Sequence, residues 1–394
     1  MKKRLFLRTA LCAFAIAATG LHAPAIQAAE KPFKVGLIVP MTGAFASTGR
    51  QLHSAVQAYM KDHGDTVAGR KIQVILKDDN GVAANSRKLA QELIVNDDVD
   101  VIAGFGLTPI TLAVAPIATQ SKTPMVLMAA QTQANTEASP YMVRSSGTIT
   151  QVTSGIAQWA VENDIKTAVT LVPDYAPGYE SEEAFKKYFL AAGGKILEEI
   201  RVPMRNPDFA PFLQRVRDVK PDALFVMLPS GPGAALLKQY GQRGLAAAGI
   251  RLIGHGAITD DDNLNQAGDA ALGVITSDYY ATSHDSEMNR KFIETYKSID
   301  GTSRPNFFGV AGYDGMHLIY EALRKTDGKA EGMAFVDAMK NLSFESPRGP
   351  VTLDPESRDF IQNIYMRKVE KVGDEYQNVE FDVIERVNAA GETK

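Results

Sequence analysis

Val35-Gly-Leu-Ile-Val-Pro-Met-Thr-Gly43 is a short apolar run that ends in turn-forming residues. The residues that follow place Leu52, Ala55 and Tyr59 on one face of a helix. This order predicts a strand over residues 34–39, then a loop, then a helix. Strands that alternate with helices in this way indicate a parallel sheet with helices on both faces.

The same alternation continues along most of the chain. In the first half, strands are predicted over residues 71–77, 99–103 and 124–129, and helices over residues 86–96 and 109–120. After the turn Ser145-Ser-Gly147, strands are predicted over residues 167–172, 195–201, 223–228 and 251–254, and helices over residues 151–163, 181–192, 209–219 and 233–244. The end of the chain adds helices over residues 311–325 and 334–341 and a hairpin over residues 351–387. We therefore expect an α/β fold with two doubly wound parallel-sheet lobes.

The N-terminus has the layout of a secretory signal peptide. An apolar run from Leu5 to Gly20 is preceded by basic residues and followed by small residues. We expect cleavage after Ala28 or Ala29, so that residues 1–29 are the signal peptide. The alternative is an N-terminal membrane anchor, but the apolar run is short and rich in alanine.

Composition excludes several classes of function. The one cysteine, Cys12, lies inside the expected signal peptide, so the mature chain has no disulfide, thiol nucleophile or zinc–thiolate site. The signal peptide holds four of the 42 basic residues and none of the 46 acidic residues, which leaves 38 basic against 46 acidic groups. This negative balance argues against a nucleic-acid or anionic-membrane partner. A length of 394 residues favours two domains.

The loop Gly104-Phe-Gly-Leu-Thr108 follows a predicted strand. In open parallel sheets, ligands bind beyond the carboxyl ends of the strands. Thr108 is expected to be a helix N-cap and Pro109 the first helical residue, so that Gly106, Leu107 and Thr108 present backbone N–H groups and the helix dipole to a ligand. That arrangement suits a carboxylate. The alternative is an ordinary capped helix start.

Loops after other strands give weaker signals. Ala129-Ala-Gln-Thr132 combines small residues, which admit a ligand to the backbone, with one hydroxyl. Tyr175 and Ser230 occupy the corresponding loops of the second lobe; the alternatives are a buried core tyrosine and a plain turn. His255 ends a predicted strand and would face the cleft, although a lone histidine is more often structural.

The sequence contains no recognisable catalytic or metal-binding pattern. A nucleophile elbow, a phosphate loop, a zinc-binding helix and a dinucleotide fingerprint are all absent. Asp260-Asp-Asp-Asn263 lacks the alternating oxygen ligands and the glycine of a calcium loop, so we interpret it as helix capping. We therefore expect a binding protein, with no enzymatic activity, cofactor or metal.

Three motifs together resemble the periplasmic leucine/isoleucine/valine-binding proteins of ABC importers: Val35–Gly43, the stretch from Gly69 to Asn80, and Asp208-Phe with Lys220-Pro-Asp222. The resemblance runs from about Phe33 to Leu353. It implies a type I periplasmic-binding fold that closes on its ligand about three hinge strands, placed near residues 144–147, 275–279 and 349–352. The implied lobes are residues 30–146 plus 279–350 and residues 147–278 plus 351–394. The resemblance also implies a monomer in the periplasm that serves an inner-membrane ABC permease and ATPase complex.

The same resemblance suggests a ligand site. In that family a carboxylate is held by groups that match Thr108, Ala130 and Thr132, and the side-chain pocket matches Phe45, Thr48, Phe308 and Tyr175. Two positions depart from the family pattern: a tyrosine is replaced by Pro229, and the acid that pairs with a ligand ammonium is replaced by Gly256. The expected ligand-binding residues are Phe45, Thr48, Gly106, Leu107, Thr108, Ala129, Ala130, Gln131, Thr132, Tyr175, Pro229, Ser230, His255, Gly256 and Phe308.

These departures predict the class of ligand. With the carboxylate anchor kept and the ammonium anchor lost, we expect an organic acid without an α-amine, and best an aromatic carboxylate between aromatic walls. An amino acid remains the alternative, with residues 260–262 as the partner of its amine. A ligand-sensing receptor domain and a secreted hydrolase are further alternatives.

Overall fold

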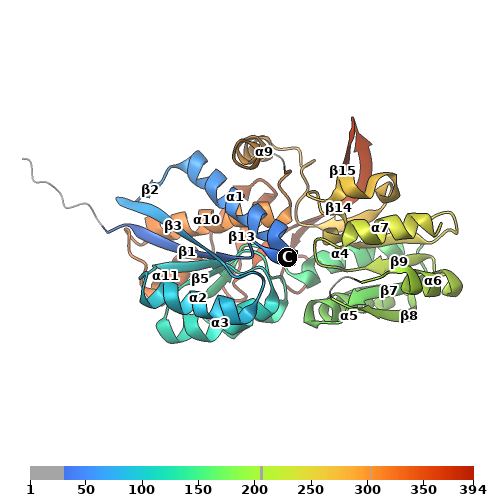
Figure 1. Cartoon of the computed structure of the whole chain (residues 1–394), viewed down its shortest axis with the longest axis horizontal. Helices are drawn as coiled ribbons and strands as arrows, with labels where there is room; N and C mark the ends of the chain where they lie inside the picture. The colour runs from blue at the N-terminus through green and yellow to red at the C-terminus, as the bar shows by residue number, and fades with distance from the viewer. Residues whose placement is uncertain (1–30, 205–206, 302) are drawn as a thin grey trace, which may run out of the picture.

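The computed structural model describes residues 31–204, 207–301 and 303–394, and it divides them into two α/β lobes that lie side by side (Figure 1). The predicted signal peptide, residues 1–29, lies outside the described residues. Each lobe is built on one sheet, and the expected fold class is confirmed.

The first lobe contains a six-stranded sheet. Its strand order is β2 (Thr66–Val67), β3 (Arg70–Asp78), β1 (Phe33–Val39), β4 (Val101–Gly104), β5 (Met125–Leu127) and β6 (Met142–Arg144). All neighbours are parallel except β2 and β3. Its helices are α1 (Ala46–His63), α2 (Ala83–Val95), α3 (Thr108–Ser121), α9 (Glu287–Asp300), α10 (Phe307–Lys325) and α11 (Gly332–Met339). A hydrophobic core covers each face of this sheet. One core contains residues of α1 and α10, and the other contains residues of α2 and α3.

The second lobe contains a nine-stranded sheet. Its order is β12 (Ser343–Ser346), β13 (Gly349–Leu353), β14 (Phe360–Val372), β11 (Ile275–Asp278), β10 (Arg251–His255), β9 (Ala223–Val226), β7 (Thr167–Pro173) and β8 (Lys195–Val202), and β15 (Glu375–Val387) pairs with β14. The neighbouring strands β8, β7, β9, β10 and β11 are parallel to one another, and β14 is antiparallel to β11. Its helices are α4 (Ile149–Glu162), α5 (Ala176–Ala191), α6 (Ala210–Val219), α7 (Gly233–Gln242) and α8 (Leu264–Ala267).

Both lobes also contain short 3₁₀ turns. These are η1 (Gly43–Phe45), η2 (Gln133–Ala138), η3 (Gly256–Thr259) and η4 (Gly268–Ala271).

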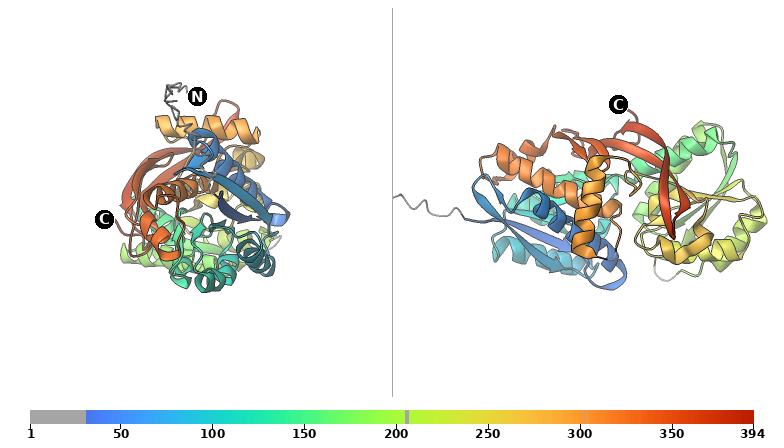
Figure 2. Two further views of the ribbon diagram at one scale, coloured as in Figure 1. Left: turned by 90° about the vertical axis from the view of Figure 1, so that its left-hand side faces the viewer. Right: turned by 90° about the horizontal axis from the view of Figure 1, so that it is seen from above.

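The chain passes between the two lobes after β6, after β11 and after α11. Seen from above, the strands at the C-terminal end run along one side of the junction (Figure 2). β12 and β13 pair with the second sheet, yet Val351 and Leu353 pack in the core that contains α1 and α10. The proposed lobe boundaries and the three hinge positions, near residues 144–147, 275–279 and 349–352, stay predictions.

Several predicted elements differ in their bounds. α5 begins at Ala176 rather than residue 181, because Pro177 lies in the first turn of the helix, where its missing N–H costs nothing. α10 begins at Phe307 rather than residue 311, because the Asn306 side chain accepts hydrogen bonds from the N–H groups of Phe308 and Gly309. Helix α9 was not predicted at all.

Candidate ligand-binding site

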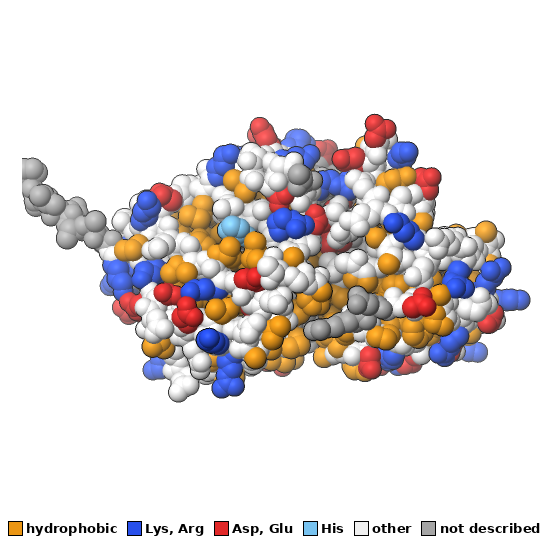
Figure 3. Space-filling model, in the orientation of Figure 1, with side chains coloured by type: hydrophobic (Ala, Val, Ile, Leu, Met, Phe, Trp, Pro, Cys, Tyr) orange, Lys and Arg blue, Asp and Glu red, His pale blue; other side chains and the backbone are white. Residues whose placement is uncertain are grey.

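A cavity lies between the two lobes, and its empty volume is about 530 Å³, which includes space open to solvent. We call it the cleft cavity. It is lined by Phe45, Thr48, Gly106, Leu107, Thr108, Ala129, Ala130, Gln131, Ile149, Tyr175, Pro177, Met227, Leu228, Pro229, Ser230, His255, Ala257, Phe307 and Phe308. On the face drawn in Figure 3, hydrophobic side chains gather where the lobes meet, and charged side chains are frequent at the outer ends.

Most of the cavity wall comes from loops that follow parallel strands, and Phe307 and Phe308 come from the start of α10. The loops after β4 and β5 belong to the first lobe, and those after β7, β9 and β10 belong to the second. Such loops meet at the carboxyl edge of a parallel sheet, which is why residues far apart in sequence come together here. Of the predicted site residues, only Thr132 and Gly256 are not part of the wall. Ile149, Pro177, Met227, Leu228, Ala257 and Phe307 line it but were not predicted.

Helix α3 points its N-terminus at the cavity. Its N-cap is Leu107, and no side chain caps it, so the expectation that Thr108 is the N-cap is wrong. The Thr108 hydroxyl instead lies 2.7 Å from the hydroxyl of Thr132, within hydrogen-bonding distance. One of the two hydroxyls donates to the other, which leaves one hydroxyl hydrogen free for a ligand. Thr132 therefore lies outside the wall itself and contacts it through Thr108.

Helix α5 presents a second N-terminus from the other lobe. Its N-cap is Tyr175, again without a side-chain cap, and Tyr175 and Pro177 both line the cavity. Burial raises the pKa of the Tyr175 phenol, so this side chain is neutral. The partial positive charges of two helix N-termini therefore face one cavity, an arrangement that favours an anion.

Gln131 and His255 meet across the cleft. The His255 Nε2 atom lies 3.1 Å from Gln131 Oε1, and its Nδ1 atom accepts a hydrogen bond from the Ala257 N–H at 3.1 Å. Burial, with a smaller contribution from Arg367, lowers the pKa of His255 to about 3. His255 is therefore neutral, and its proton lies on Nε2, where it is donated to Gln131.

Aromatic rings form an apolar part of the wall. The ring centroids of Phe307 and Phe308 are 4.2 Å apart, and the ring of His255 meets Phe307 edge-on at 6.3 Å. Phe45 lines the cavity from the start of α1. Phe307 was missed because its helix was expected to begin later; the neighbouring Asn306, a strong N-cap residue, is the signal that could have found it.

The cavity wall carries no Asp, Glu, Lys or Arg among the described residues. The run from Asp260 to Asn263 was expected to cap a helix, and its last residue, Asn263, is the N-cap of α8, although its side chain makes no capping hydrogen bond. Asp260 instead accepts a hydrogen bond from Asn306 Nδ2 at 2.8 Å, and Asp262 accepts hydrogen bonds from Arg50 Nη2 at 2.7 Å and from Ser47. These carboxylates join the two lobes outside the cavity wall.

The structure also shows why position 256 has no side chain. A Cβ atom added to Gly256 would lie 2.1 Å from Asp278 Oδ2 and 2.2 Å from Arg367 Nη2. The space is occupied by these two buried, oppositely charged groups. No acid can therefore stand at Gly256 without displacing them.

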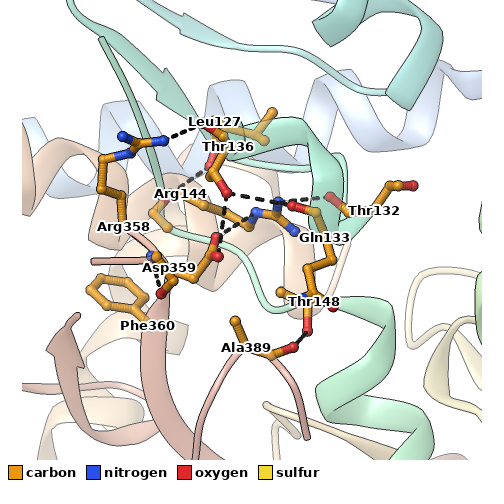
Figure 4. Close-up of polar contacts among 12 residues, drawn as sticks. Leu127, Thr132, Gln133, Thr136, Arg144, Thr148, Arg358, Asp359, Phe360 and Ala389 are labelled. Carbon is orange, nitrogen blue, oxygen red and sulfur yellow. Dashed lines mark hydrogen bonds and ion pairs between the residues drawn. The ribbon is translucent and has the colours of Figure 1, made fainter. Parts of the chain in front are cut away.

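Arg144 holds the loop that follows β5 in place (Figure 4). Its Nη2 atom donates to the carbonyl oxygen of Thr132 at 2.7 Å, and its Nε atom lies 3.0 Å from Asp359 Oδ1. Both charged side chains are fully or almost fully buried. The N–H of the next residue, Gln133, donates to Glu180 of α5 at 3.0 Å, so this loop is tied to both lobes.

The described residues contain neither a cluster of metal-binding side chains nor a helix suited to cross a membrane. No group of three or more His, Cys, Asp or Glu side chains in residues 31–204, 207–301 and 303–394 is placed to hold a metal ion. Within the same residues, no helix has both the length and the apolar character needed to cross a membrane.

The comparisons with known proteins agree with the bilobal architecture. The sequence pattern of a family described as periplasmic binding protein matches residues 32–374. The chain belongs to this family. Among its curated relatives, a Leu/Ile/Val-binding protein homolog 6 from Brucella abortus is 41% identical over 387 residues, which are 97% of each chain. The resemblance to leucine/isoleucine/valine-binding proteins is thus confirmed.

Two solved structures are similar to this periplasmic binding protein over nearly the whole chain. A solute binding protein of an ABC transporter from Rhodopseudomonas palustris BisB5, in complex with 3,4-dihydroxy benzoic acid, is 56% identical with a TM-score of 0.89, and the match covers 92% of this chain and 99% of that one. A solute binding protein from R. palustris in complex with 4-hydroxybenzoate is 37% identical with a TM-score of 0.88, covering 91% and 98%.

Proposed function

We propose that this periplasmic binding protein captures an aromatic carboxylate in the cleft cavity and delivers it to an ABC importer. The observation that carries this proposal is the character of the cavity wall. It combines aromatic and aliphatic side chains with two uncapped helix N-termini, and it contains no charged side chain among the described residues.

A carboxylate fits this wall because neutral donors and helix N-termini stabilise an anion. In this proposal the free hydroxyl hydrogen of the Thr108–Thr132 pair and the N-terminus of α3 hold the carboxylate. An aromatic ring then packs against Phe45, Phe307 and Phe308.

An ammonium group fits poorly. A buried charge without a partner costs several kcal/mol, and the wall offers no carboxylate. Three carboxylates, Asp260 to Asp262, were expected to be possible partners, but none of them is part of the cavity wall. Asp260 and Asp262 also accept hydrogen bonds from Asn306, Arg50 and Ser47. The two similar solute binding proteins that were solved with hydroxylated benzoates support the same class of ligand.

The remaining parts of the proposal follow from the family. The protein acts as a monomer in the periplasm after removal of residues 1–29, and an inner-membrane permease with its ATPase receives the ligand. The lobes are residues 30–146 plus 279–350 and residues 147–278 plus 351–394. They close on the ligand because the cavity wall draws residues from both lobes.

A second candidate is transport of branched-chain amino acids. The relative from B. abortus, which is 41% identical, is named as a Leu/Ile/Val-binding protein homolog. Calorimetric titration of the mature protein with benzoate, hydroxybenzoates, leucine, isoleucine and valine separates the two. We expect the aromatic acids to bind and the amino acids to give no heat. Binding of the amino acids alone would overturn the proposal.

A further inference from the structure

Two polar atoms in the wall of the cleft cavity have no hydrogen-bond partner within the described residues. They are Nε2 of Gln131 and Oγ of Ser230. Each of the two residues is only 9% exposed, so bulk water does not supply the missing partner. Buried polar atoms are nearly always hydrogen-bonded in folded proteins, so both atoms point to a polar group on the ligand.

The chemistry of the Gln131 group follows from its neighbour. Because Nδ1 of His255 accepts the Ala257 N–H, the proton of the neutral ring lies on Nε2 and is donated to Gln131 Oε1. The amide of Gln131 is therefore oriented, with its NH₂ group near the Tyr279 hydroxyl and at least one N–H left without a partner. This group can only donate, so its partner on the ligand is an oxygen acceptor.

The Ser230 group lies in the loop after β9, in the other lobe. The Ser230 hydroxyl faces the buried carboxylate of Asp260, whose pKa burial raises to about 6, but the two groups do not meet the geometry of a hydrogen bond. A serine hydroxyl that points its hydrogen toward a carboxylate can still accept a hydrogen bond. Its partner on the ligand is then a donor.

We propose that Gln131 and Ser230 recognise hydroxyl substituents on the aromatic ring, so that the cavity selects hydroxylated benzoates over benzoate itself. This inference rests on the proposed function and makes its ligand class narrower. A phenolic oxygen accepts from the Gln131 amide, and a phenolic hydrogen is donated to Ser230. Two neighbouring hydroxyls on one ring would give each protein group its own partner.

The expected selectivity is moderate to strong. A ligand that lacks the hydroxyl leaves a buried donor and a buried acceptor unpaired, which weakens binding by about ten- to a hundredfold. A methyl group in place of the hydroxyl fills the same space without forming the hydrogen bonds. It therefore separates a hydrogen-bonding effect from a packing effect.

The test is a double-mutant cycle between ligand and protein, measured by titration calorimetry on the mature protein. The ligands are benzoate, 3- and 4-hydroxybenzoate, 3,4-dihydroxybenzoate and the 3- and 4-methyl analogues. The variants are Ser230→Ala and Gln131→Met, which keep the volume of the side chain nearly unchanged. Ser181→Ala is the matched control, because Ser181 is a buried serine of the second lobe that pairs with Thr153 outside the cavity wall.

In the wild type we expect at least one hydroxylated acid to bind about tenfold or more tightly than benzoate and than its methyl analogue. Ser230→Ala or Gln131→Met should remove most of that ratio, and Ser181→Ala should keep it. Equal affinity for benzoate and every hydroxylated acid would overturn the inference, as would a ratio that survives in both cavity variants. If no aromatic acid binds, the proposed function fails as well, so the two failures are distinguishable.

Discussion

Thr108 contributes to the cleft cavity through a single hydroxyl, shared with Thr132 at 2.7 Å. Replacing Thr108 with valine keeps the shape and removes the hydroxyl. We expect the affinity for an aromatic acid to fall about ten- to a hundredfold, because a hydrogen bond to a charged group is worth roughly 1.5–3 kcal/mol. Titration calorimetry measures the loss.

Thr119→Val is the control for this variant. Thr119 lies on the same helix, is exposed, and donates to the carbonyl of Ala115 at 2.9 Å. It should leave the affinity unchanged. If Thr108→Val binds as tightly as the wild type, the carboxylate is held elsewhere.

His255 makes stability depend on pH. Burial lowers its pKa from the ordinary 6.5 to about 3, so below pH 6.5 the unfolded chain binds a proton that the folded chain does not. The free energy of unfolding that His255 contributes is complete above pH 6.5 and is lost as the pH falls toward 3. Between pH 7 and pH 4 the wild type should lose roughly 3 kcal/mol more than His255→Gln.

Denaturant unfolding at several pH values measures this difference. His284→Gln provides a contrast of opposite sign, because the hydrogen bond to Glu380 raises the pKa of His284. The stability from His284 is therefore present at low pH and is lost as the pH rises. Parallel pH profiles for the wild type and His255→Gln would show that His255 titrates normally in the folded protein.

For individual residues, the sequence predicted which side chains line the cleft cavity better than it predicted their hydrogen-bond partners. Thr108, Ala130, Gln131, Tyr175 and His255 all line the cleft cavity as expected. Their hydrogen bonds were not predictable, because the pair Gln131–His255 joins residues 124 positions apart and depends on how the two lobes pack.

The contact between α1 and the segment that follows η3 is an element-scale feature. Ser47 and Arg50 of α1 both donate to Asp262 in the other lobe. These bonds exist only when the lobes are together, so Asp262→Ala should speed ligand dissociation and leave association nearly unchanged. The Arg50 side chain is 43% exposed, so we expect a factor of only about three to ten.

Stopped-flow measurement of both rate constants tests this prediction. Asp337→Ala is a suitable control, since Asp337 pairs with Lys340 within one lobe and is exposed to solvent. An unchanged dissociation rate in Asp262→Ala would mean that this contact does not stabilise the closed form.

The sequence predicted most strands of both sheets and most helices, because their apolar periodicity is strong. It failed where local signals compete. The segment Ala176-Pro-Gly178 suggests a loop, yet Pro177 is tolerated in the first turn of α5. The run from Asp260 to Asn263 suggested helix capping, and Asn263 is the N-cap of α8. Only the packing of the lobes shows that Asp262 bonds to Arg50 of α1 and that Asp260 bonds to Asn306, the N-cap of α10.

The whole molecule is expected to open and close. The cleft cavity draws its wall from both lobes, and the chain passes between the lobes three times. We therefore expect the radius of gyration, measured by small-angle scattering, to decrease when a saturating aromatic acid is added. A radius that does not change on saturation would show that binding does not require closure.

The bilobal shape was predictable from the alternation of strands and helices and from the family motifs. The antiparallel strands at the C-terminal end were expected only as a hairpin, and their pairing with β11 was not. That pairing joins residues about 90 positions apart, for which a single sequence holds no local signal.

The most direct test of the central claim is a crystal structure of the mature protein with 4-hydroxybenzoate. We expect the ligand in the cleft cavity, with its carboxylate beside Thr108 at the N-terminus of α3 and its ring against Phe45 and Phe308. A ligand bound outside this cavity, or a saturated crystal with an empty cleft, would contradict the proposal that the cavity is a binding site for aromatic acids.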